Sequence, residues 1–93
     1  MTDHELAKNL EELLAETGPA HHQAFIATNG EDPNWAEWYA EYLRLRLNTM
    51  LETGFSVSEL AALLTEAEAD RSKHTPDAEW PRSYAEYLLE RFG

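Results

Sequence analysis

A stretch of sixteen residues occurs twice in this chain. Residues 32–47 align with residues 77–92 without a gap, and eight of the sixteen aligned positions are identical. The identities are Asp32/Asp77, Trp35/Trp80, Tyr39/Tyr84, Ala40/Ala85, Glu41/Glu86, Tyr42/Tyr87, Leu43/Leu88 and Arg46/Arg91. Both copies have apolar residues three and four positions apart, which is typical of an amphipathic helix. The repeat therefore predicts a helical unit that is present twice.

A second pair of matched signals precedes the two copies. Thr2 with Glu5, and Ser56 with Glu59, each fit the capping box that starts a helix, and leucines at helical spacing follow both. The simplest interpretation is a duplicated two-helix unit with pseudo-two-fold symmetry, one copy over about residues 1–53 and the other over about residues 55–93. We therefore predict one all-α domain over residues 1–93, a compact bundle of four to five helices.

Glycine and proline set the expected helix boundaries in the first half. The first helix should end at Gly18 and Pro19, because glycine commonly ends a helix and proline interrupts one. A short extra helix with the sequence AHHQAFIA would begin at Pro19 and stop at Asn29 and Gly30. This helix would account for the greater length of the first half.

The remaining boundaries follow from similar signals. Asp32 should cap the next helix, with Pro33 at its first position, and that helix should run to about Glu52. The helix after the second capping box should stop within residues 70–77, where Thr-Pro breaks the pattern. The last helix should cover about residues 80–92.

Composition narrows the class of protein. Eighteen acidic and seven basic side chains give a formal net charge of −11. Nucleic acids and anionic membranes both attract basic surfaces, so neither is an expected partner. The chain has no cysteine, and no apolar run approaches the about 18 residues of a membrane span. We expect a cytoplasmic protein with no cofactor.

Each copy of the repeat places three aromatic side chains and an arginine on one helix face. In the simplest interpretation the rings form the core, and each arginine lies along a tyrosine and pairs with a carboxylate. The alternative is a pocket between the repeats, in which two guanidinium groups bind a carboxylate or phosphate. The predicted ligand-binding residues are Trp35, Tyr39, Arg46, Trp80, Tyr84 and Arg91, with His22 at the mouth of the pocket.

Two adjacent histidines, His21 and His22, are the natural candidates for catalysis. Neighbouring positions on a helix point about 100° apart, so the two rings cannot bind one metal in the usual i, i+4 manner. We expect His22 to be the partly buried member of the pair; the functional alternative is that it acts as a base beside Glu37 or Glu41. No metal-binding motif occurs, and we predict neither a metal site nor a catalytic residue.

Trp38 is where the two copies differ most, because its counterpart is Ser83. A tryptophan without an equivalent in the second copy could cover the extra helix. It could instead be an exposed anchor at a protein interface, where tryptophan is enriched.

The segments AHHQAF and GEDPNWAEWYAEYL, within residues 20–43, resemble a pattern found in small uncharacterised bacterial helical proteins, A-H-H-x-A-F followed by D-P-x-W-x-x-W-Y-A-x-Y-L. The resemblance covers less than a third of the chain. It implies a bacterial cytosolic origin, and it assigns no activity and no functional residue.

Three functions remain compatible with the sequence. The leading hypothesis is a non-enzymatic protein-interaction module that forms a homodimer, since a short chain gains core by pairing with itself. The second is a binder of a small anionic ligand, or a minor enzyme, that uses the pocket described above. The third is an acidic regulator that covers the basic surface of another protein.

Overall fold

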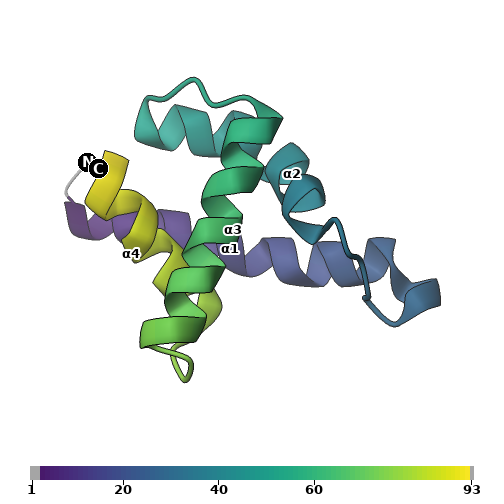
Figure 1. Cartoon of the computed structure of the whole chain (residues 1–93). Helices are drawn as coiled ribbons and strands as arrows, with labels where there is room; N and C mark the ends of the chain where they lie inside the picture. Colours follow the sequence, from purple (N-terminus) through teal and green to yellow (C-terminus); the bar gives the residue numbers. More distant parts are fainter. Residues whose placement is uncertain (1–2, 93) are drawn as a thin grey trace.

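Residues 3–92 fold into four α-helices and one short 3-10 helix, arranged as in Figure 1. The computed structural model describes residues 3–92, and no strand occurs among them. The elements are α1 (Asp3–Ala24), η1 (Ile26–Thr28), α2 (Trp35–Leu51), α3 (Val57–His74) and α4 (Trp80–Phe92). The predicted all-α bundle is confirmed. The predicted capping box at Thr2 lies outside the described residues.

The four helices enclose one core. The main contacts form a closed ring in which α1 packs on α2 and α4, while α3 packs on α2 and α4. Figure 1 shows the first turns of α1 close to the last turns of α4, and η1 at the opposite end of α1. Leucines dominate the buried side chains: Leu10, Leu13, Leu14, Leu43, Leu47, Leu51, Leu60, Leu64 and Leu88, together with Ala40, Ala67, Ala85, Tyr84 and Tyr87.

Helix α1 overturns the predicted break at Gly18 and Pro19. The helix continues through both residues to Ala24, so the separate AHHQAFIA helix does not form. Pro19 is exposed, whereas Leu14, Thr17 and His21 of the same helix are buried. A Cβ atom at Gly18 would lie 3.2 Å from Trp80, so the glycine allows this ring to approach the helix closely. Packing on the buried side thus outweighs the one backbone hydrogen bond that proline removes.

Helix α2 begins later than predicted. Its first residue is Trp35, and Asn34 occupies the cap position without a capping side-chain bond. Asp32 is engaged elsewhere, because its Oδ1 accepts the backbone N–H of Asn34 at 2.9 Å and its Oδ2 bonds His21. The helix ends at Leu51, close to the predicted boundary, and Glu52 follows it in the left-handed conformation.

The second half follows the sequence closely. Ser56 and Glu59 form the predicted capping box: the Glu59 N–H donates to the Ser56 hydroxyl at 3.1 Å, and the Ser56 N–H donates to the Glu59 carboxylate at 3.0 Å. Helix α3 ends at His74, within the predicted stretch, and α4 has the predicted limits. None of the helices formed by residues 3–92 has the length and apolar character needed to cross a bilayer.

Candidate functional site

Four of the seven predicted ligand-binding residues lie around one pocket. Trp35 and Tyr39 of α2 and Trp80 and Tyr84 of α4 line it, and α3 supplies Glu68 and Arg71, which the sequence did not single out. The pocket has a volume of about 360 Å³ and is open to solvent. We call it the aromatic pocket.

The rings of the aromatic pocket contact one another in a continuous chain. The ring centroids of Trp35 and Tyr39 are 5.4 Å apart, those of Tyr39 and Trp80 are 5.7 Å apart, and those of Trp80 and Tyr84 are 5.0 Å apart. The interplanar angles of 82°, 51° and 63° describe edge-to-face and tilted contacts, which aromatic pairs prefer. The chain of rings joins α2 to α4, as expected if these residues are mainly core.

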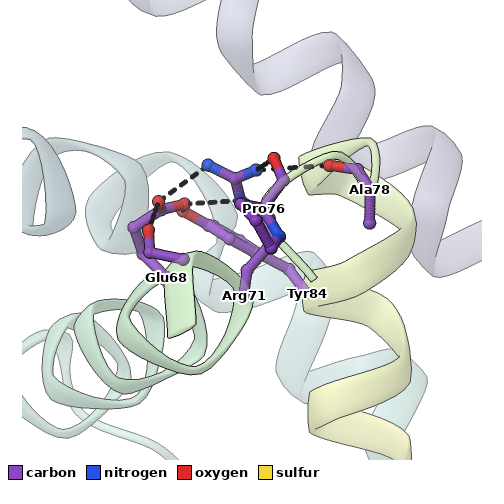
Figure 2. A network of polar contacts seen from close by, with 6 residues as sticks. Glu68, Arg71, Pro76, Ala78 and Tyr84 are labelled. Atoms are coloured by element: carbon purple, nitrogen blue, oxygen red, sulfur yellow. Dashed lines mark hydrogen bonds and ion pairs between the residues drawn. The ribbon is translucent and has the colours of Figure 1, made fainter. Parts of the chain in front are cut away.

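A charged network forms the polar side of the pocket. Figure 2 shows the Arg71 guanidinium between the Glu68 carboxylate and the loop that connects α3 to α4. Arg71 donates to both Glu68 oxygens, at 3.0 and 2.8 Å, and to the carbonyl oxygens of Pro76 and Ala78, at 3.0 and 3.2 Å. Tyr84 of α4 donates to Glu68 at 2.7 Å. Arg71 thus ties the end of α3 to the loop that leads into α4.

The polar groups of this network are almost fully occupied. The Glu68 carboxylate accepts two bonds from Arg71, one from Tyr84 and one from Ser72, the last at 2.7 Å. Four bonds use the whole acceptor capacity of a carboxylate, and Arg71 uses four of its five N–H groups. Neither side chain is free to act as a base or to hold an anion.

The electrostatics of the pocket agree with this geometry. The bonds from Arg71, supported by those from Tyr84 and Ser72, lower the pKa of Glu68 to about 2. Burial, followed by the bond to Glu68, raises the pKa of the Tyr84 hydroxyl. Burial alone raises the pKa of Tyr39, whose hydroxyl makes no hydrogen bond with the rest of residues 3–92. The pocket therefore contains a neutralised ion pair and one available hydroxyl.

The two predicted arginines do not enter the pocket, which corrects the pairing of Arg46 with Arg91. Arg46 donates to Glu16 at 2.9 Å, and its guanidinium lies 5.0 Å from the Tyr42 ring. Arg91 lies 3.7 Å over the ring of Tyr87. Each arginine stays on the solvent side of its own helix, because a charged group is cheaper to keep near water than to bury without a ligand.

The burial of the two histidines is the reverse of the prediction. His21 is buried, and its Nε2 lies 3.1 Å from Asp32 Oδ2, while His22 is exposed and is not among the residues that line the aromatic pocket. The error follows from the wrong break at Pro19. Once α1 is continued, the buried positions Leu14 and Thr17 lead to residue 21 on the same face.

Trp38 lies over the segment that replaces the extra helix. Its ring is half-buried, with centroids 5.1 Å from His21 and 6.4 Å from Phe25, and it stacks on Tyr42 at 5.5 Å with an interplanar angle of 13°. Glu68 and Arg71 were missed because the helix was expected to stop within residues 70–77, a stretch that begins just after Glu68 and contains Arg71. The only available signal was their opposite charge at i, i+3 spacing.

No group of three or more His, Asp or Glu side chains converges on a metal position in the part of the chain that the structure describes. No protein-family model matches the chain, and no curated protein or solved structure matches it either.

Proposed function

We propose that this chain is a non-enzymatic protein-interaction module. The main support for the proposal is that the polar groups of the aromatic pocket are already hydrogen-bonded within the protein. Its carboxylate and guanidinium bond each other, a tyrosine, a serine and the backbone, so they maintain the fold. A general base or an anion-binding arginine must keep bonding capacity for a substrate. Glu68 and Arg71 have almost none left.

The outer face of α2 is the proposed contact surface. Leu45 is 71% exposed in the middle of this helix, more than any other large apolar side chain of residues 3–92. Helix α2 has two acidic and two basic side chains, Glu37, Glu41, Arg44 and Arg46, and therefore no net charge, whereas the whole chain carries −11. Two copies that meet through α2 would therefore join helices without net charge, and we propose a homodimer around Leu45.

Sedimentation velocity at increasing protein concentration tests this proposal. The chain of 10.7 kDa should sediment as a dimer, and Leu45→Glu should convert it to a monomer without loss of helicity. Ala69→Glu adds the same charge at an exposed position of α3 and should leave the dimer intact. A wild-type protein that stays monomeric at every concentration would rule out the homodimer.

A second candidate function rests on the size of the aromatic pocket. A volume of about 360 Å³ lies within the range of small-molecule sites, and the Tyr39 hydroxyl and one N–H group of Arg71 remain available. With its ion pair neutralised, such a pocket suits an uncharged planar molecule better than the anion that the sequence suggested. Native mass spectrometry of protein purified gently from its own host tests this candidate, since a bound molecule adds its mass. A spectrum with the chain mass alone would count against it.

A further inference from the structure

A second hollow lies on the other side of α2, next to Trp38. It has a volume of about 300 Å³ and is lined by Phe25, Asp32, Asn34, Glu37, Trp38 and Glu41. We call it the acidic hollow. Its lining residues on α2 precede Leu45, the nearest of them, Glu41, by one helical turn, and it shares no lining residue with the aromatic pocket.

The charged side chains of the acidic hollow are all carboxylates. Asp32 is satisfied within the fold by His21 and by the backbone of Asn34. Glu37 and Glu41 lie one turn apart and are exposed, and neither forms an ion pair within residues 3–92. Like charges at this spacing repel each other, so a cation placed between them would relieve an unfavourable interaction.

The apolar wall of the hollow is aromatic. Phe25 and Trp38 are both half-buried and meet edge to face, with an interplanar angle of 75°. The ring of tryptophan attracts cations more strongly than that of any other side chain, and a planar guanidinium can also stack on it. An aromatic surface bordered by unpaired carboxylates is complementary to an arginine side chain.

Helix α4 provides an internal comparison. At the positions that align with Glu37, Trp38 and Glu41 it carries Arg82, Ser83 and Glu86. There the charge is neutralised within the helix, since Arg82 Nε lies 3.3 Å from the Glu86 carboxylate. Of these two helices, only α2 therefore combines unpaired carboxylates with a tryptophan ring at these positions.

We propose that the acidic hollow binds an arginine side chain presented by a basic segment of a partner protein. The guanidinium packs against the exposed part of the Trp38 ring and pairs with Glu37 and Glu41. The net charge of −11 attracts such a segment over a longer range and speeds the encounter. The proposal goes beyond the homodimer, because it concerns another part of α2 and another occupant.

Isothermal titration calorimetry of the full chain with a synthetic peptide tests this inference. The probe is a flexible Gly-Ser peptide with three arginines, and its control has citrulline, which is uncharged and nearly the same shape, in each arginine position. We expect saturable binding of the arginine peptide and no measurable binding of the citrulline peptide. Binding should be retained in Leu45→Glu, which separates this result from the test of the homodimer.

Two pairs of charge variants distinguish binding at the acidic hollow from general electrostatic attraction between the peptide and an acidic protein. Glu37→Gln with Glu41→Gln should weaken binding about tenfold, as expected for the loss of two partly exposed ion pairs. Glu86→Gln with Glu90→Gln removes the same charge at the same spacing on α4 and should change the affinity less than about twofold. Trp38→Phe, which keeps an aromatic ring, should weaken binding less than Trp38→Leu, and circular dichroism would confirm that both variants fold.

Three results would overturn the proposal. The first is absence of binding to the arginine peptide, and the second is equal binding of the citrulline peptide. The third is equal weakening by the two pairs of charge variants, because the attraction would then come from the net charge and not from the hollow.

Discussion

The hydroxyl of Tyr84 donates a 2.7 Å hydrogen bond to Glu68, and this bond joins α4 to α3 at the edge of the aromatic pocket. The same carboxylate holds Arg71, which in turn holds the loop between the two helices. One carboxylate therefore organises the end of α3, the loop and the start of α4. The pocket that the sequence suggested for a ligand is built around this internal contact.

Replacing Tyr84 with phenylalanine should lower the free energy of unfolding by about 1–2 kcal/mol, because Glu68 loses a partly buried hydrogen bond to a charged group. Tyr39→Phe is the matched control. It removes a hydroxyl from the same pocket that has no partner in residues 3–92, and its effect should be close to zero. Urea denaturation measures both. Equal losses would mean that the bond to Glu68 contributes nothing specific.

Stability should fall in acid because of Glu68. Its pKa is lowered from 4.5 to about 2 in the folded chain, so the unfolded chain takes up the proton first. The stabilisation is therefore fully present above pH 4.5 and is lost as the pH falls from 4.5 toward 2. Urea denaturation across this range should show a shallower decline in Glu68→Gln than in the wild type. The same slope in both proteins would assign acid unfolding to other groups.

The arginines should differ sharply in their effect on stability. Arg71→Met should lower the free energy of unfolding more than Arg46→Met does, since it leaves Glu68 without its ion-pair partner and removes the donor to two loop carbonyls. Arg46→Met should cost less than about 1 kcal/mol, because the Arg46–Glu16 pair is half-exposed. Thermal unfolding followed by circular dichroism compares them. A larger loss for Arg46 would contradict the structural role given to Arg71.

The two histidines should also differ in how much their replacement lowers the free energy of unfolding. His21→Ala should cost about 2 kcal/mol, because it leaves a cavity beneath Trp38 and Tyr39 and an unpaired carboxylate at Asp32. His22→Ala, at an exposed neighbouring position, should change the free energy of unfolding by less than about 0.5 kcal/mol. Urea denaturation of the two variants side by side gives the comparison. If His22 proved the costlier loss, the course of α1 beyond Pro19 would be wrong.

The sequence was sufficient wherever local chemistry decides the structure. The Ser56 capping box, the limits of α4 and the all-helical class depend on hydrogen bonds and periodicity within one segment, and all three are confirmed. The aromatic stripes also lie at the core or its edge, as expected from helical spacing. The pseudo-two-fold duplication remains a prediction.

Tertiary contacts decided the rest. Pro19 is a strong local signal for a helix break. The helix nevertheless continues, because Gly18 packs against Trp80, a residue more than sixty positions later in the chain. That continuation turns His21 inward and His22 outward. The choice of Arg71 over Arg46 and Arg91 likewise depends on where the loop carbonyls of Pro76 and Ala78 lie. Periodicity identifies the helix face on which a side chain lies, but only the packing of the helices determines which atoms it meets across the gap.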